Sequence, residues 1–220
     1  MTCSLCEKPD VILQKSHIIP KFIFKFIKKT GGSDFLRTAE NPNKREQDGL
    51  KKYLLCWDCE QLLSNWETEF SNQLFYPYYK GETDFDYKDW LIRFCVSISW
   101  RNLMLSKLDN DLKHLSKKQL VTANFALKVW GDFLLGKKPN PGSFEQHLLL
   151  LDTVEEHTFK PEDVPPTLNR YLNRAVDLDI MASPNQAFIY TKLPLFLIVG
   201  IIDMKSSKKW VNTKVKLRGK

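Results

Sequence analysis

The chain has 220 residues, 43% of them hydrophobic, which is enough to build the core of one domain or of two small ones. Residues 1–6 have neither the basic nor the apolar stretch of a signal peptide. The longest apolar run, residues 195–202, is far shorter than the roughly 20 residues that a membrane helix needs. Five cysteines, four of them in two C-x-x-C pairs, fit metal binding in a reducing compartment better than a disulfide framework. We therefore expect a cytoplasmic protein without membrane segments.

The formal net charge of +7 favours polyanionic partners such as nucleic acid, and the charge is unevenly distributed. Residues 1–55 contain eleven Lys or Arg against six acids, whereas residues 56–87 contain one Lys against seven acids. Residues 204–220 contain seven Lys or Arg and no acid. A basic tail of this kind is equally typical of a solvated terminus, so the basic first quarter is the stronger candidate for a contact with phosphates.

The first third of the chain predicts an extended stretch, a helix and a turn-rich segment before the second cysteine pair. Residues 11–16 are extended in pattern, and Pro20 suits the first position of a helix over 20–29 because its missing N–H costs nothing there. Gly-Gly-Ser at 31–33 ends this helix, and the turn-rich segment 34–50 contains one further candidate strand at 35–38. Residues 51–55 lead into the second cysteine pair, and after Cys59 apolar residues recur at helical spacing.

The rest of the chain predicts a mixed body. Residues 75–87 are aromatic and loop-like, and helices are expected over 88–108 and 117–135, the second capped by Ser116 and Gly136. We then expect strands at 147–154 and 187–193, a short helix at 167–175, and a hairpin that joins 195–203 to 210–217. The predicted fold class is α+β, with an N-terminal module over 1–87 packed on a body over 88–220.

Two cysteine pairs, Cys3/Cys6 and Cys56/Cys59, are the most informative motif. The C-x-x-C spacing lets both sulfurs of a pair point at one ion, and four thiolates close a tetrahedral structural zinc site. A knuckle with one pair and a helix whose first turn carries the other is the arrangement of a treble-clef finger. The alternative is a set of reduced core cysteines, which would leave the segment between the pairs without a staple. The fifth cysteine, Cys95, lies among apolar residues and is expected in the core.

His17 lies inside the loop that the cysteines would close. Hydrolysis of a phosphodiester bond needs a base to activate water and a divalent ion to hold the scissile phosphate. A neutral imidazole suits the first task at neutral pH. The alternative is that His17 caps an element or packs. His114, His147 and His157 lack spaced partners, so we expect them to be structural or exposed.

These motifs together resemble the zinc-containing branch of the HNH endonucleases. The resemblance rests on Cys3-x-x-Cys6, on Ser-His-Ile-Ile-Pro at 16–20 and on Leu-Leu-Cys-x-x-Cys-Glu at 54–60, and it covers residues 3 to about 70. That family has a ββα-metal, treble-clef-like core, so the resemblance implies a metal-dependent endonuclease that hydrolyses phosphodiester bonds, with DNA favoured over RNA. A similar arrangement occurs in proteins of bacterial phage-defence loci, which implies a setting in antiviral defence.

The resemblance also implies roles for single residues. By position His17 matches the general base, and the four cysteines match the structural zinc ligands. Ser16 stands where a metal-binding Asp or His is usual, and Glu60 replaces the final His of the family pattern. Lysines fill the expected Asn slot, which leaves Asp48 as the nearest candidate ligand. A catalytic Mg²⁺ or Mn²⁺ would therefore be held by Glu60 with Asp48 and His17, since carboxylates suit these ions.

Phosphate contacts are expected from the basic first quarter, where they would give affinity but little sequence selectivity. A solvated surface is the alternative for each candidate. The rival to a nuclease is a catalytically inactive zinc-finger module that binds nucleic acid or a protein partner. The body over 88–220 would position substrate, form a homodimer or bind a partner protein. The candidate phosphate contacts are Lys21, Lys25, Lys28, Arg37, Lys44, Arg45 and Lys51.

Overall fold

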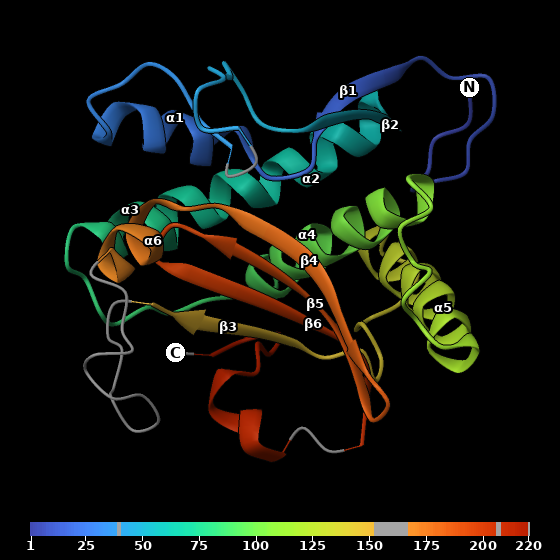
Figure 1. Cartoon of the computed structure of the whole chain (residues 1–220). Helices are drawn as coiled ribbons and strands as arrows, with labels where there is room; N and C mark the ends of the chain where they lie inside the picture. Colours follow the sequence, from blue (N-terminus) through green and yellow to red (C-terminus); the bar gives the residue numbers. More distant parts are fainter. Residues whose placement is uncertain (39–40, 152–166, 206–207, 220) are drawn as a thin grey trace.

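A two-stranded antiparallel sheet organises the N-terminal module. β1 (Leu13–His17) pairs with β2 (Lys51–Cys56), and α1 (Lys21–Thr30) lies between them in the chain. α2 (Trp57–Phe70) follows β2 directly and runs beneath the hairpin in Figure 1. The computed structural model describes residues 1–38, 41–151, 167–205 and 208–219. The extended stretch predicted at 11–16 and the helix predicted at 20–29 are confirmed within two residues at their ends, and the helical pattern predicted after Cys59 corresponds to α2.

The segment 34–50 between α1 and β2 contains one isolated bridge, between Leu36 and Glu46, in place of the strand predicted at 35–38. The loop predicted at 75–87 is wrong in its first part. A π-helical turn η1 (Ser71–Phe75) continues α2, and the short helix α3 (Tyr76–Tyr79) follows it. The reason is burial: the Phe75 ring is fully buried and packs edge-on against Phe26 of α1, with ring centroids 4.9 Å apart.

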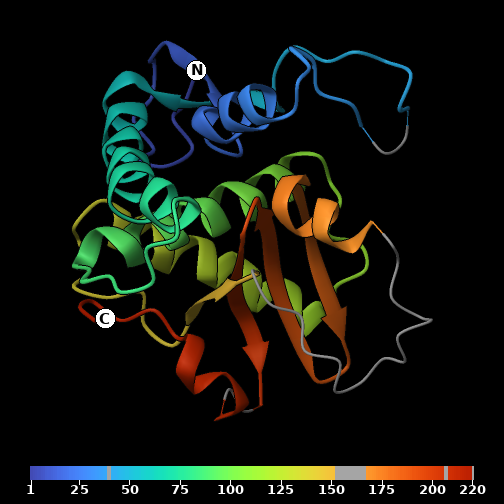
Figure 2. The ribbon, with the colours of Figure 1, turned by 90° about the vertical axis from the view of Figure 1, so that its left-hand side faces the viewer.

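The body consists of two long helices on one face of a four-stranded antiparallel sheet (Figure 2). The helices are α4 (Asp89–Leu108) and α5 (Lys117–Leu134), as predicted. The strand order is β3 (Gln146–Leu150), β6 (Phe196–Met204), β5 (Gln186–Leu193) and β4 (Asp177–Ser183). A short helix α6 (Leu168–Arg174) precedes β4. The mixed α+β class is therefore confirmed.

α4 is the central element, because it contacts α2 of the N-terminal module and all four strands of the sheet. It is buried almost all round, as expected for a helix whose apolar residues do not keep to one face. α4 crosses the sheet at Gly200, where an added Cβ would lie 2.6 Å from the Ser99 hydroxyl oxygen. The Ser99 hydroxyl donates to Gln146 Oε1 of β3 at 2.8 Å. Glycine at 200 thus permits the close approach of helix and sheet.

The hairpin predicted between 195–203 and 210–217 is wrong. β6 pairs with β5 on one side and with β3 on the other, so no edge is left for the tail. The two-residue connection Pro194–Leu195 makes the β5–β6 hairpin, with Leu195 at φ 69°. The described part of the tail instead forms a 3-10 helix η3 (Lys208–Thr213) and two isolated bridges, from Lys214 to His147 of β3 and from Gly219 to Tyr87. The predicted strand at 147–154 is described only to residue 151, and His157 also lies outside the described residues.

The N-terminal module and the body share one core. Buried apolar side chains from Cys3 to Val215 form a continuous cluster that crosses the predicted boundary at residue 87. Polar contacts also join the parts: for example, Arg174 of α6 donates to the carbonyl of Ile27 near the end of α1, and Lys52 of β2 pairs with Asp109 at the end of α4. In the described part of the chain, no helix has the length and hydropathy of a membrane span.

The N-terminal cap of α5 allows the contribution of a local interaction to the stability of the body to be measured. The Ser116 hydroxyl accepts from the backbone N–H of Gln119, and the Gln119 side chain accepts from the Ser116 N–H, which makes a capping box. We expect Ser116→Ala to lower the free energy of unfolding by about 1 kcal/mol, measured by urea denaturation. Ser64→Ala, at an exposed site within α2, should be neutral or slightly stabilising. Equal effects of the two changes would contradict the assignment of the cap.

Candidate metal centre and active site

Four cysteine sulfurs converge at one end of the β1–β2 hairpin. Cys3 and Cys6 come from the turn before β1, Cys56 ends β2, and Cys59 lies in the first turn of α2. Their sulfur atoms all lie within 4.8 Å of one another, and the Cys6 and Cys56 sulfurs are 3.8 Å apart. A tetrahedron of sulfurs at about 2.3 Å from zinc has edges of about 3.8 Å. The four cysteines could therefore hold one metal ion such as zinc.

The surroundings of the cluster suit thiolates that face a cation. The backbone N–H of Cys56 donates to Cys3 Sγ at 3.3 Å. Burial raises the pKa of the Cys3 thiol, but hydrogen bonds from the backbone N–H groups of Cys6, Cys56 and Leu5 outweigh burial and lower the pKa to about 7. For Cys59, burial and the charge of Cys3 raise the thiol pKa well above its usual range. Four such sulfurs cannot all ionise without a cation among them, and a bound metal ion supplies that charge.

His17 ends β1 and is paired with Asp48 from the loop before β2. His17 Nε2 lies 3.0 Å from Asp48 Oδ2, and the His17 side chain is 15% exposed. Asp48 Oδ2 also accepts from Lys51 Nζ at 2.6 Å, and Oδ1 accepts from the N–H of Gly49. Partial burial raises the pKa of Asp48, but the hydrogen bonds from Lys51, His17 and Gly49 hold that pKa well below its usual range.

The ionised Asp48 decides the tautomer of His17. A carboxylate can only accept hydrogen bonds, so in the neutral ring of His17 the hydrogen is on Nε2 and the lone pair is on Nδ1. Asp48 therefore orients the imidazole through Nε2, and Nδ1 is the nitrogen that could act as a base.

Ser16 and Glu60 form a second pair on the other side of the strand. Ser16 is fully buried, and its hydroxyl donates to Glu60 Oε2 at 2.5 Å. Glu60 lies in the first turn of α2, directly after Cys59, where the helix N-terminus favours a negative charge. Two of the positions at which the sequence departs from the HNH pattern, Ser16 and Glu60, are thus neighbours in space.

The structure brings the three predicted catalytic residues only partly together. Asp48 contacts His17, whereas Glu60 contacts Ser16. A shared ion needs at least three potential ligands whose donor atoms lie close together. Within the described residues the four cysteines meet this condition, whereas His17, Asp48 and Glu60 do not. Both carboxylate oxygens of Asp48 are engaged by other groups, so Asp48 has the position of an orienting partner for His17.

Sequence reasoning missed Arg101, which reaches this site from the middle of α4. Its guanidinium is almost completely buried, and one nitrogen donates both to the backbone carbonyl of His17 at 2.9 Å and to Glu67 Oε1 of α2 at 2.7 Å. A buried arginine needs such partners. The signal in the sequence was a charged residue near the middle of a mostly apolar helix, and nothing local identifies its partners.

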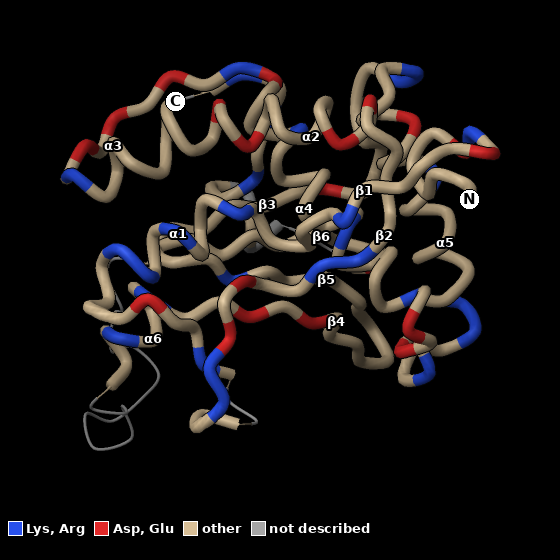
Figure 3. Tube along the Cα trace, turned by 90° about the horizontal axis from the view of Figure 1, so that it is seen from above, with Lys and Arg blue, Asp and Glu red and all other residues tan. Residues whose placement is uncertain are grey.

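The predicted phosphate contacts divide into two groups. Lys21 and Lys25 are exposed on α1 and form no hydrogen bond or ion pair with the described residues. Figure 3, which looks down on this module, shows the basic positions of α1. The other five interact within the module: Lys28 with the Gln47 carbonyl, Arg37 with the Pro42 carbonyl, Lys44 with Glu46, Arg45 with the Phe35 ring, and Lys51 with Asp48.

The remaining histidines have structural surroundings, as far as they are described. His114 Nε2 lies 3.0 Å from the Ile180 carbonyl of β4. His147 is fully buried in β3, and its Nδ1 contacts the Trp210 carbonyl and the Thr213 hydroxyl of the tail. Cys95 is buried in α4 and lies outside the cysteine cluster, as predicted.

Comparison of the chain with protein-family models, with curated proteins and with solved structures returned no match.

The cysteine cluster gives a direct prediction. We expect about one zinc ion per purified chain by elemental analysis, and Cys56→Ser should remove most of it. Because metal binding is part of the folding free energy, amide hydrogen exchange should rise more in residues 1–70 than in the body. The matched control is Cys95→Ala, which removes a buried cysteine outside the cluster and should leave the zinc content unchanged. Zinc well below one ion per chain in the wild type would contradict the site.

Proposed function

We propose that this protein is a metal-dependent nuclease of the HNH type that hydrolyses phosphodiester bonds in DNA, with RNA as the less favoured substrate. The proposal includes a structural zinc ion on Cys3, Cys6, Cys56 and Cys59 and a treble-clef-like arrangement of the N-terminal module. The setting we propose is antiviral defence in the cytoplasm, on the resemblance of the sequence motifs alone.

The observation that carries the proposal is the pairing of His17 with an ionised Asp48 at the end of β1. This pairing leaves His17 Nδ1 with a lone pair. The order of elements around it supports the same proposal: a cysteine pair, β1, α1, β2, and then α2 with the second pair at its start. Apart from α1, which lies between the two strands, this order is the one that the HNH resemblance implies.

In the proposed reaction, His17 Nδ1 accepts a proton from the attacking water. Asp48 holds the ring and stabilises the imidazolium that forms, and Arg101 fixes the backbone of His17 through its carbonyl. Glu60 would hold a Mg²⁺ or Mn²⁺ ion, which supplies positive charge at the scissile phosphate. A carboxylate beside a hydroxyl offers the oxygen donors that these ions prefer, and Mg²⁺ commonly takes only one or two carboxylates with water.

The exposed lysines of α1 would bind the phosphates on either side of the cleaved bond. Lys21 and Lys25 suit this role because they form no hydrogen bond or ion pair with the described residues that binding to a phosphate would have to break. Such contacts are electrostatic and independent of sequence, so affinity should fall steeply with salt.

A second candidate function is a catalytically inactive zinc-finger module that binds nucleic acid or a protein. A specific observation favours it: Ser16 occupies a usual ligand position, and its hydroxyl is already bonded to Glu60. The body, or a homodimer formed through it, would then supply the partner surface.

The variant His17→Ala distinguishes the two candidates. If His17 is the base, cleavage of plasmid or oligonucleotide in Mg²⁺ or Mn²⁺ should fall by about 10²- to 10⁴-fold, while zinc content and affinity stay unchanged. The control is His114→Ala, an exposed histidine of the body. A wild type that binds but cuts nothing with any divalent ion would favour the inactive module.

Glu60→Gln tests the catalytic metal separately from the zinc. The amide oxygen can still accept from Ser16, so fold and zinc content should persist while the stimulation of cleavage by Mg²⁺ or Mn²⁺ is lost. Asp58→Asn, which removes the other acid of the same helical turn, should cleave normally. Normal cleavage by Glu60→Gln would show that Glu60 has no catalytic role and only stabilises the N-terminus of the helix by its charge.

A further inference from the structure

One face of the β1–β2 hairpin places an exposed aromatic ring beside the candidate base. In the ladder, His17 lies opposite Lys51, and Lys15 lies opposite Tyr53. Side chains two positions apart on a strand, and those directly opposite on paired strands, share a face of the sheet. His17, Lys15, Lys51 and Tyr53 therefore share one face.

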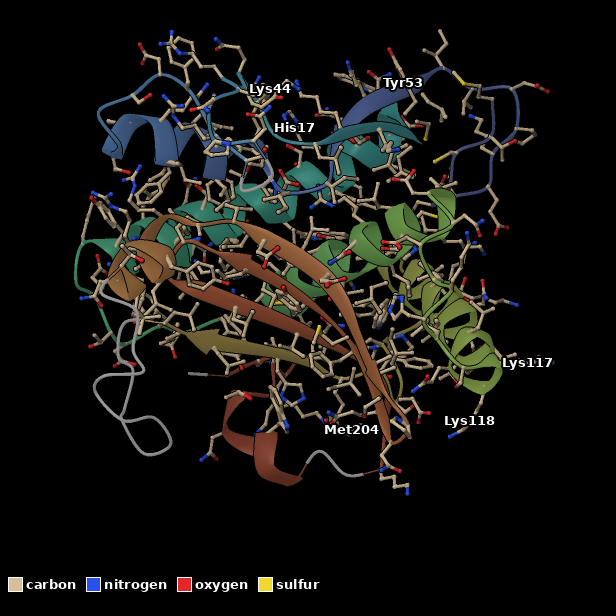
Figure 4. All side chains as sticks on the ribbon, in the orientation of Figure 1. His17, Lys44, Tyr53, Lys117, Lys118 and Met204 are labelled. Atoms are coloured by element: carbon tan, nitrogen blue, oxygen red, sulfur yellow. The ribbon has the colours of Figure 1, made fainter. Side chains whose placement is uncertain are left out.

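This face points to solvent. The residues between them in the ladder, Ser16 and Lys52, have the opposite orientation: Ser16 is buried against Glu60 of α2, and Lys52 pairs with Asp109 of the body. Tyr53 is 61% exposed, and Lys15 across from it is also exposed. Figure 4 shows His17 and Tyr53 on the same upper side of the molecule, above the hairpin.

Tyr53 has no interaction that would explain an aromatic residue at this position. It forms no hydrogen bond, ion pair or ring contact with any other described residue. Isolated exposed apolar residues are common on protein surfaces, so exposure alone carries no conclusion. The position of Tyr53 is what distinguishes it: diagonal neighbours in an antiparallel pair lie about 7–8 Å apart, which is the relation between Tyr53 and His17.

The chemistry of this face matches that of a nucleotide with an exposed base. An aromatic ring stacks on the face of any nucleobase, and lysines beside it attract the phosphates. Lys15 is exposed, whereas Lys51 is shared with Asp48, and both lie within the basic first quarter of the chain. Bases within a duplex stack on one another and do not offer this face to a protein side chain.

We propose that Tyr53 is a base-stacking residue and that the substrate class is single-stranded nucleic acid. This inference rests on the proposed nuclease function and narrows its substrate. A base stacked on Tyr53 would hold the adjoining phosphate near His17.

The test measures binding to a labelled single strand of DNA, the same sequence as a duplex, and the matching RNA strand. Buffer without added divalent ion keeps the substrates intact, and omitting a chelator preserves the zinc. Wild type should bind the single strands more tightly than the duplex. Tyr53→Ala should weaken single-strand binding by about 5- to 150-fold, and Tyr53→Phe, which keeps the ring, should bind as the wild type does.

The matched control is Phe125→Ala, which removes a ring that is 56% exposed on α5 of the body and should leave binding unchanged. A 2-aminopurine base in the single strand supplies a second readout, because its fluorescence falls on stacking with Tyr53 and stays high with Tyr53→Ala. The DNA and RNA arms decide which backbone the site accepts.

The possible failures are distinguishable. If the wild type binds or cuts nucleic acid but Tyr53→Ala leaves single-strand affinity unchanged, the stacking role is wrong and the nuclease proposal stands. If the wild type binds the duplex more tightly than the single strands, the stacking role is likewise wrong and the nuclease proposal stands. If the wild type binds none of the three substrates, both proposals fail.

Discussion

The convergence of four cysteine sulfurs is the constraint on which the N-terminal module depends. Cys6 and Cys56 are 50 positions apart in the chain, yet their sulfurs are 3.8 Å apart. The closed segment contains β1, α1 and the loop before β2, and closing a loop of this length carries an entropic cost that a bound ion can offset. The β1–β2 ladder starts at this closure, with Leu13 opposite Cys56, and runs to His17 opposite Lys51. The position of the candidate base therefore depends on the cluster.

The body supports the candidate base as well. Arg101 extends from α4 to the His17 carbonyl, and α4 is held against the sheet where Ser99 meets Gly200 and Gln146. A series of packed contacts thus leads from the sheet to the backbone of His17. A buried arginine with a carboxylate partner is sensitive to any displacement, because losing one contact leaves a charge unpaired in the core. Contacts from both the module and the body therefore position His17.

Elements with strong local signals were predictable, and those set by pairing were not. The periodic apolar pattern located α4 and α5, and the Ser116 cap and Gly136 marked the ends of α5. The edge strand β4 was not predicted, because it contains Asp177 and Asp179, and aspartate is uncommon in strands. The tail was misassigned since its partner strand β6 was already paired on both sides, which depends on the whole sheet.

The sequence by itself determined the chemistry that is available: four thiols at metal-ligand spacing, a histidine after a strand, and a basic first quarter. Only the tertiary structure decided how these groups are paired. Asp48 meets His17 across 31 positions, Glu60 meets Ser16 across 44, and Arg101 reaches His17 across 84. Hydrogen bonds between residues so far apart leave no periodic trace in a single sequence, because their geometry arises from the packing of α2 against the hairpin and of α4 against α2.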